Sequence, residues 1–198
     1  TDGALIALPD ERDFVDLDRS TRNLPRVSCD TFGGFIFVNK NPEAAPLLDY
    51  LGDAAQMLEP LHCENLREVY RQSTVVPCNW KVTAEAFLEV YHFKHIHSNK
   101  DGWAVLDNRR AVMGLFDGGH SRMTTGYSEQ HVKRQGMDSW DDWKPLDNGD
   151  FAIIQTENTD FLNMLDCTST AVSYFPNYII PLGSFGFPVL LFWPIDKR

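Results

Sequence analysis

The sequence predicts an α+β fold built on an antiparallel sheet, and two observations indicate this class. Strand-like apolar runs separated by short turns follow one another over residues 111–127 and 168–193. Helical patterns are few, at residues 45–61, 79–92 and 151–165, and they do not alternate with single strands as they would in a parallel sheet. The length of 198 residues suits one domain, or one domain with a piece of another.

The first third of the chain predicts two strands, one helix and a further strand. A turn signal at Asp2-Gly3 precedes a short apolar strand over residues 4–8, as in the last hairpin of a preceding domain. Residues 35–38 are expected to form a buried strand. Over residues 45–61 apolar side chains recur at steps of three and four, with Pro46 in the first turn, which indicates an amphipathic helix. Residues 67–76 are expected to form the next strand.

The second half predicts strands around one more helix. Two strands flank the glycine turn "DGGH" within residues 111–127, and His120 in that turn is expected to be exposed. Residues 128–150 are polar and predict a loop. Asp150 is available as the N-cap of a helix over residues 151–165, and two or three strands follow in residues 168–193.

Composition excludes several classes of protein. Eighteen Lys and Arg against 28 Asp and Glu give a net charge of −10, which argues against nucleic acid or an anionic membrane as a partner. No stretch approaches the roughly 20 apolar residues of a membrane span. The four cysteines are far apart, so we expect free thiols in a reducing cytoplasm. The chain lacks a secretion leader and an initiator Met, which suggests that its natural N-terminus lies further upstream.

The segment "EAFLEVYHFKHIH", residues 85–97, concentrates chemistry-bearing side chains. On one continuous helix, five residues would share a face, namely Glu85, Ala86, Glu89, His92 and Phe93. A polar stripe on a helix that is apolar all round needs a partner, and a metal ion satisfies carboxylate and imidazole together. His92 and His97 are about 140° apart on an ideal helix, so they can converge only if the helix ends or kinks between them. We expect this break just after His92.

Other interpretations of these histidines stay open at this point. A histidine in apolar surroundings is often a structural core residue. Glu89-x-x-His92 is half of a di-iron motif whose second half is missing, and the HExxH motif of zinc proteases is absent.

Residues 78–97, "CNWKVTAEAFLEVYHFKHIH", resemble the start of the catalytic domain in alpha subunits of Rieske non-haem iron ring-hydroxylating oxygenases. The matching positions are Asn79, Trp80, Lys81, Glu89, Tyr91, His92 and His97. "GALIALPDERDF" is similar to the tail of the family's Rieske domain, and "GGFIFVNKNPEAAPLLDYLG" to the segment that links the two domains. "VLLFWPID" is similar to the strand before the family's last helix, so the resemblance covers nearly the whole chain.

The resemblance implies a helix-grip, Bet v 1-like catalytic domain in which an antiparallel sheet wraps a long helix. Residues 1–30 would be the C-terminal tail of a Rieske domain and linker. Residues 31–198 would be the mononuclear iron domain, truncated at its C-terminus, so that the chain alone is expected to be inactive.

The resemblance also implies roles for individual residues. His92 and His97 would be two ligands of a facial triad that holds Fe(II) and leaves positions open for dioxygen and substrate. Glu89 would relay an electron from a Rieske cluster in a neighbouring subunit. Ala86 and Phe93 are candidates for lining the substrate pocket. The third ligand, an acidic residue, would lie beyond Arg198; Asp160 and Asp166 are internal substitutes that match no family position.

The implied cofactors are Fe(II), a 2Fe-2S Rieske cluster in the missing N-terminal part, and NAD(P)H through a partner reductase, with or without a ferredoxin. The implied assembly is a homotrimer or an alpha3beta3 complex in the cytoplasm. The reaction would insert one or both atoms of O2 into an aromatic or other small organic substrate. Five apolar residues could contact that substrate or simply fill the core of the sheet, namely Val112, Met113, Leu115, Phe185 and Phe187.

Two rival functions remain. One is a helix-grip module that binds a small molecule and whose histidines are structural. The other is a zinc hydrolase using His92, His97 and a carboxylate, for which no general base stands in a suitable motif.

Overall fold

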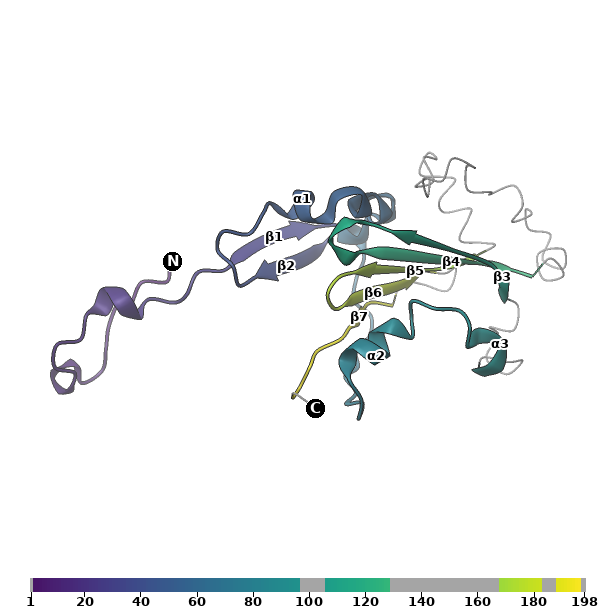
Figure 1. The fold of residues 1–198 in the computed structure, drawn as a ribbon. Coiled ribbons are helices and arrows are strands. Elements are labelled where there is room, and N and C mark those ends of the chain that lie inside the picture. The colour runs from purple at the N-terminus through teal and green to yellow at the C-terminus, as the bar shows by residue number, and fades with distance from the viewer. Residues whose placement is uncertain (1, 97–105, 129–167, 183–187, 197–198) are drawn as a thin grey trace.

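The computed structural model describes residues 2–96, 106–128, 168–182 and 188–196 (Figure 1). Its centre is an antiparallel sheet in which five strands follow the order β3-β4-β5-β6-β7. These strands are Leu106–Leu115 (β3), Ser121–Tyr127 (β4), Thr168–Tyr174 (β5), Tyr178–Leu182 (β6) and Leu190–Leu191 (β7). The predicted combination of helices with an antiparallel sheet is confirmed.

A separate hairpin packs beside this sheet. It consists of β1, Ser28–Phe32, and β2, Phe35–Asn39. Only β2 was predicted, and the expected burial is wrong for Ile36 and Val38, which are exposed. Gly33 and Gly34 form its turn with positive φ angles of 56° and 80°. A Cβ on Gly34 would lie 2.8 Å from the backbone of Glu64, so only glycine lets the turn approach that closely. The Phe35 ring meets the Tyr178 ring of β6 with centroids 4.9 Å apart.

The predicted helix over residues 45–61 is a run of short helical pieces. α1, Leu47–Leu51, is followed by the 3-10 helices η3, Gly52–Met57, η4, Glu59–Leu61, and η5, Cys63–Asn65. The prediction of one long α-helix is therefore wrong. Gly52 has a φ of 49°, outside the helical region, and Pro60 cannot donate a backbone hydrogen bond. Most of the predicted apolar face is confirmed, since Leu47, Leu51, Ala54 and Leu58 are buried, whereas Leu48 is 59% exposed.

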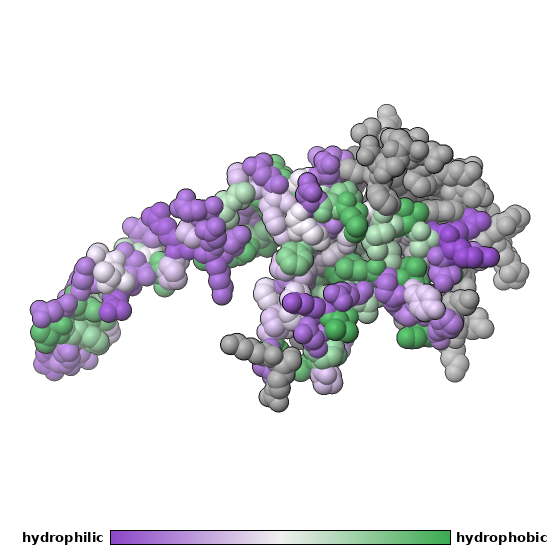
Figure 2. All heavy atoms as spheres, in the orientation of Figure 1, coloured by the Kyte–Doolittle hydropathy of each residue, from purple (hydrophilic) through white to green (hydrophobic). Residues whose placement is uncertain are grey.

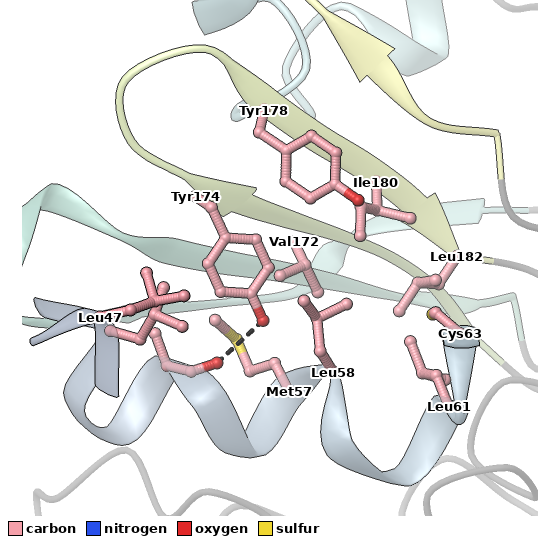
Figure 3. Packing of buried hydrophobic residues seen from close by; sticks show 12 residues of the cluster. Leu47, Met57, Leu58, Leu61, Cys63, Val172, Tyr174, Tyr178, Ile180 and Leu182 are labelled. Atoms are coloured by element: carbon pink, nitrogen blue, oxygen red, sulfur yellow. Dashed lines mark hydrogen bonds between the residues drawn. The ribbon is translucent and has the colours of Figure 1, made fainter. Parts of the chain in front are cut away.

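The main core lies between this helical run and one face of β5 and β6 (Figure 3). Alternate strand residues point to it, as expected for a sheet of period two. They are Val172, Tyr174, Tyr178, Ile180 and Leu182. The Tyr174 hydroxyl donates a hydrogen bond of 2.9 Å to the carbonyl oxygen of Ala54, which joins β5 to η3.

Two predicted strands are not formed. Residues 66–76 form neither a helix nor a strand and belong to neither sheet, and Val69 is 95% exposed. Residues 4–8 lie in an arm, residues 2–27, that projects from the body and contains the 3-10 helices η1, Glu11–Asp13, and η2, Arg19–Arg22. Figure 2 shows apolar and polar side chains interspersed along this arm. An apolar run becomes a strand only when another strand completes its hydrogen bonds, and the described residues provide none here.

The opposite face of the large sheet faces α2, Trp80–Glu85, and α3, Phe93–Ile96 (Figure 1). The continuous helix predicted over residues 79–92 is therefore wrong. The described ranges contain no long helix for the sheet to wrap, and residues 151–165 lie outside them, so the helix-grip arrangement stays a prediction. Nor does any helix in these ranges have the length and apolar character needed to cross a membrane.

Candidate metal-binding segment and pocket

Helix α2 begins with a side-chain cap. The Oδ1 atom of Asn79 accepts a hydrogen bond of 2.9 Å from the backbone N–H of Lys81, which satisfies one of the donors that a helix start leaves unpaired. At the other end the bonds tighten to 3-10 spacing, from Phe87 N–H to the Ala84 carbonyl and from Leu88 N–H to the Glu85 carbonyl. The chain then leaves the helix, six residues after Asn79.

Glu89 explains why the helix does not continue. Its Oε2 atom accepts hydrogen bonds from the backbone N–H groups of Tyr91, at 2.5 Å, and of His92, at 3.3 Å. In a continuous helix these two donors would bond to the carbonyls of Phe87 and Leu88. The carboxylate therefore competes with the helical backbone and stabilises a turn in its place. As a result, the predicted single helical face from Glu85 to Phe93 does not exist.

The same carboxylate contacts the His92 ring. Oε1 of Glu89 meets Nδ1 of His92, and the two side chains are 44% and 22% exposed. Desolvation opposes the ionisation of Glu89, but the hydrogen bonds from His92 and from Tyr91 N–H outweigh it and hold the pKa of Glu89 below its ordinary value. A histidine that donates Nδ1–H to a carboxylate has its lone pair on Nε2, which is the tautomer in which a carboxylate-oriented histidine ligates a metal.

The structure does not bring the other predicted site residues together with Glu89 and His92 at a metal site. Ala86 is exposed, and Phe93 is half-buried with its ring against that of His92, at a centroid distance of 4.9 Å. His97, Asp160 and Asp166 lie outside the described residues. Within the described ranges no three His, Cys, Asp or Glu side chains gather as a possible metal site. The convergence of His92 and His97 therefore stays a prediction.

A pocket of about 340 Å³ lies between residues 88–91 and strands β3 and β4. Most of its lining is apolar, from Leu88, Val90, Ala111, Val112, Met113 and Met123. Its remaining lining residues are Glu89, Tyr91 and Asn108. Neither Ala86 nor Phe93 lines it, so these two are not placed at the pocket that the structure describes.

Sequence reasoning found part of this lining and missed the rest. Val112 and Met113 were candidates for substrate contact, whereas Leu115 is 72% exposed, and Phe185 and Phe187 lie outside the described residues. Asn108 was missed because "DNRR" has the composition of a polar turn. Only the pairing of β3 with β4 brings it to the pocket.

His120 corrects another expectation, because it is 1% exposed. Gly118 and Gly119 have φ angles of 73° and 82°, and this turn directs the ring inwards. A Cβ on Gly118 would lie 2.9 Å from the ring's Nε2 atom. Both ring nitrogens are engaged, Nε2 with the Tyr50 carbonyl and Nδ1 with the Phe175 N–H, so His120 has a structural role.

Comparison with known proteins places residues 63–198 in one family. These residues match the model described as "Ring hydroxylating alpha subunit (catalytic domain)". The 2-aminobenzenesulfonate 2,3-dioxygenase subunit alpha of an Alcaligenes species is 29% identical over 146 residues, which are 72% of this chain and 37% of the relative. The large oxygenase component of the naphthalene 1,2-dioxygenase system of Pseudomonas putida is 34% identical over 137 residues, which are 64% of this chain and 30% of the relative.

A solved structure shares the fold. The quaternary ammonium Rieske monooxygenase CntA, in complex with an inhibitor, matches 98% of this chain and 45% of its own, with a TM-score of 0.62 and 19% identity. At this identity the likeness concerns the fold alone. The chain spans about a third of the length of the two curated relatives.

Proposed function

Since the chain belongs to the family of ring-hydroxylating alpha subunits through their catalytic domain, we propose that it provides the mononuclear iron site of an oxygenase. The reaction would insert oxygen from O2 into an aromatic or other small organic substrate. One observation carries the proposal: Glu89 contacts Nδ1 of His92 at the edge of a largely apolar pocket.

Two histidines and one carboxylate would suit Fe(II). His92, with Nδ1 directed to Glu89, and His97 would hold the ion, because imidazole suits Fe(II), and an acidic residue would be the third ligand. Bound iron would supply the activation of dioxygen. Glu89 would hold a proton at Nδ1 and fix the orientation of the ring. The apolar lining would bind the hydrocarbon part of the substrate and exclude water.

The wider assembly is also part of the proposal. Glu89 would connect this centre to a Rieske 2Fe-2S cluster of a neighbouring subunit, in a homotrimer or an alpha3beta3 complex. NAD(P)H would deliver electrons through a reductase, with or without a ferredoxin. Residues 1–30 would be the end of the Rieske domain and linker, and residues 31–198 the catalytic domain. The names of the relatives, an alpha subunit and a large oxygenase component of a system, support an assembly of several components.

Iron content and oxygen consumption of the complete gene product test the proposal. The wild-type protein should contain mononuclear iron in addition to its cluster iron, and His92→Ala and His97→Ala should each lose the mononuclear iron and substrate-dependent O2 consumption. His95→Ala is the matched control, because His95 is exposed and its ring faces Tyr91 at a centroid distance of 6.1 Å. If the His92→Ala protein keeps its full iron content, the proposal that His92 binds the iron is wrong. A metal-free wild-type protein that still binds small molecules would favour a binding module with structural histidines.

A further inference from the structure

The polar side chains of the pocket differ in what they can offer to a bound molecule. Both carboxylate oxygens of Glu89 already accept hydrogen bonds, from Tyr91 N–H, His92 N–H and the His92 ring. Tyr91 is 78% exposed, so its side chain is largely hydrated. The Asn108 carboxamide, in contrast, has no hydrogen-bond partner within the described part of the chain. It is therefore the polar group of the lining that is best placed to bind a ligand.

Asn108 lies in an irregular part of the pairing between β3 and β4. Leu106 pairs with Tyr127, and the next aligned pair is Ala111 with Thr125. Residues 107–110 of β3 therefore lie opposite the single residue Gly126 of β4. Such an insertion interrupts the ladder and redirects the side chains of the bulged strand.

Asp107 stabilises this irregular segment. Its Oδ1 atom accepts hydrogen bonds from the backbone N–H of Arg109, at 3.1 Å, and from Nε of the same residue, at 3.0 Å. Its Oδ2 atom accepts from Nη2 of Arg109 at 2.9 Å, and Nε of Arg110 lies 3.9 Å away. The Asp107 side chain is only 14% exposed, so these bonds fix the backbone on both sides of Asn108.

We propose that Asn108 is a specificity-determining residue of the pocket and selects aromatic substrates that carry an uncharged hydrogen-bonding substituent. This inference rests on the proposed function of the site. The six apolar residues would contact the ring, and the thioethers of Met113 and Met123 make favourable contacts with aromatic groups. The carboxamide would bind a hydroxyl or amino substituent, because it both donates and accepts. The carboxylate of Glu89 in the same lining would disfavour an anionic substituent.

The test compares three probes of similar size, toluene, phenol and benzoate, by calorimetric measurement of Kd with the complete gene product. In the wild-type protein phenol should bind more tightly than toluene and benzoate. Asn108→Leu should lower the ratio of the toluene Kd to the phenol Kd about fivefold and leave the toluene Kd unchanged. Asn108→Ala should lower the ratio similarly, which keeps the test valid if the leucine variant folds poorly.

Tyr91→Phe, which removes the other neutral polar group of the lining, is the matched control. It should leave the ratio unchanged, because the Tyr91 side chain is largely exposed to water. The inference is overturned if Asn108→Leu weakens both ligands equally, if Tyr91→Phe is the variant that lowers the ratio, or if benzoate binds the wild-type protein as tightly as phenol. Iron content, measured in the same samples, separates the two proposals. If the wild-type protein contains mononuclear iron but the Asn108 variants keep the wild-type ratio, only the role of Asn108 is refuted. If the wild-type protein lacks this iron but the Asn108 variants lower the ratio as expected, only the oxygenase proposal is refuted.

Discussion

Nε2 of His120 lies 3.0 Å from the carbonyl oxygen of Tyr50, seventy residues earlier in the chain. The backbone N–H of Phe175 donates to Nδ1 of the same ring at 3.1 Å, so Nδ1 is unprotonated and Nε2 donates its proton to Tyr50. The Tyr50 hydroxyl completes the contact by donating to the Phe175 carbonyl at 2.8 Å. A neutral histidine therefore joins α1 to the turn between β5 and β6.

This arrangement predicts a loss of stability in mild acid. Burial lowers the pKa of His120, although its bond to the Tyr50 carbonyl acts in the opposite direction. The unfolded state, with a histidine pKa of about 6.5, then binds more protons than the folded state. The stability that His120 contributes is fully present above about pH 6.5 and is lost as the pH falls through the lower folded-state pKa. Urea unfolding at about pH 7.5 and about pH 5.5 measures this difference.

Two variants assign the effect to the ring. His120→Leu should cost about 2 kcal/mol at neutral pH, because two backbone groups lose their partner, and should weaken the pH dependence. Tyr50→Phe removes a neighbouring hydrogen bond of the same turn without removing the imidazole. It should lower the free energy of unfolding by about 1 kcal/mol at both pH values. Equal pH dependence in wild type and His120→Leu would contradict the assignment.

The contact between Glu89 and His92 predicts a graded effect on metal binding. Glu89→Gln can still contact Nδ1 but is uncharged, so it should orient the ring less firmly and reduce iron affinity about tenfold. Iron retained after dialysis against a weak chelator measures the change. Glu85→Gln is the control, since Glu85 is an exposed glutamate at the end of α2. Comparable iron loss in both variants would show that the effect is not specific to Glu89.

Glu89 also shows where sequence patterns reach their limit. Apolar periodicity correctly predicted the buried face of residues 47–58 and the hairpin of β3 and β4, because burial of one face determines both. It predicted a continuous helix through residue 92, where the carboxylate of Glu89 in fact captures two backbone donors. A side chain that competes with backbone carbonyls for N–H donors does not change the spacing of apolar residues, so periodicity cannot predict it.

The parts of the site that depend on distant contacts could not be predicted in the same way. Glu89 and His92 were singled out as part of a polar stripe in an apolar segment, and the match of seven residue types to a known family then implied their roles. Asn108 comes to the pocket through the register of β3 against β4, and His120 is buried through contacts with Tyr50 and Phe175. Neither position carries a local signal, since both stand in polar, turn-like surroundings.

Arg122 predicts a stabilising substitution. It lies on β4 opposite Val172, is 7% exposed, and its Nε atom has no hydrogen-bond partner among the described residues. Desolvation accordingly lowers the pKa of its guanidinium. Arg122→Met keeps the length of the side chain and removes the buried charge, so it should raise the free energy of unfolding by about 1 kcal/mol. Thermal and urea unfolding of the purified chain measure the change.

The exposed Arg12 supplies the comparison for Arg122. Its side chain is 85% exposed, so Arg12→Met should change stability by less than about 0.5 kcal/mol. A clear destabilisation by Arg122→Met would instead show that the guanidinium has an anionic partner outside the described residues.

Tyr174 and Tyr178 provide the most closely matched pair of substitutions, because both are buried, face the same core and differ in one bond (Figure 3). The Tyr174 hydroxyl donates to the Ala54 carbonyl at 2.9 Å, whereas the Tyr178 hydroxyl has no partner among the described residues. Burial raises the pKa of both phenols, so both stay neutral near pH 7. Tyr174→Phe should therefore cost about 1 kcal/mol, since it leaves a buried carbonyl unpaired, and Tyr178→Phe should be neutral or stabilising. Urea unfolding of the two variants decides the matter, because equal losses would mean that the Tyr178 hydroxyl also has a partner in the folded chain.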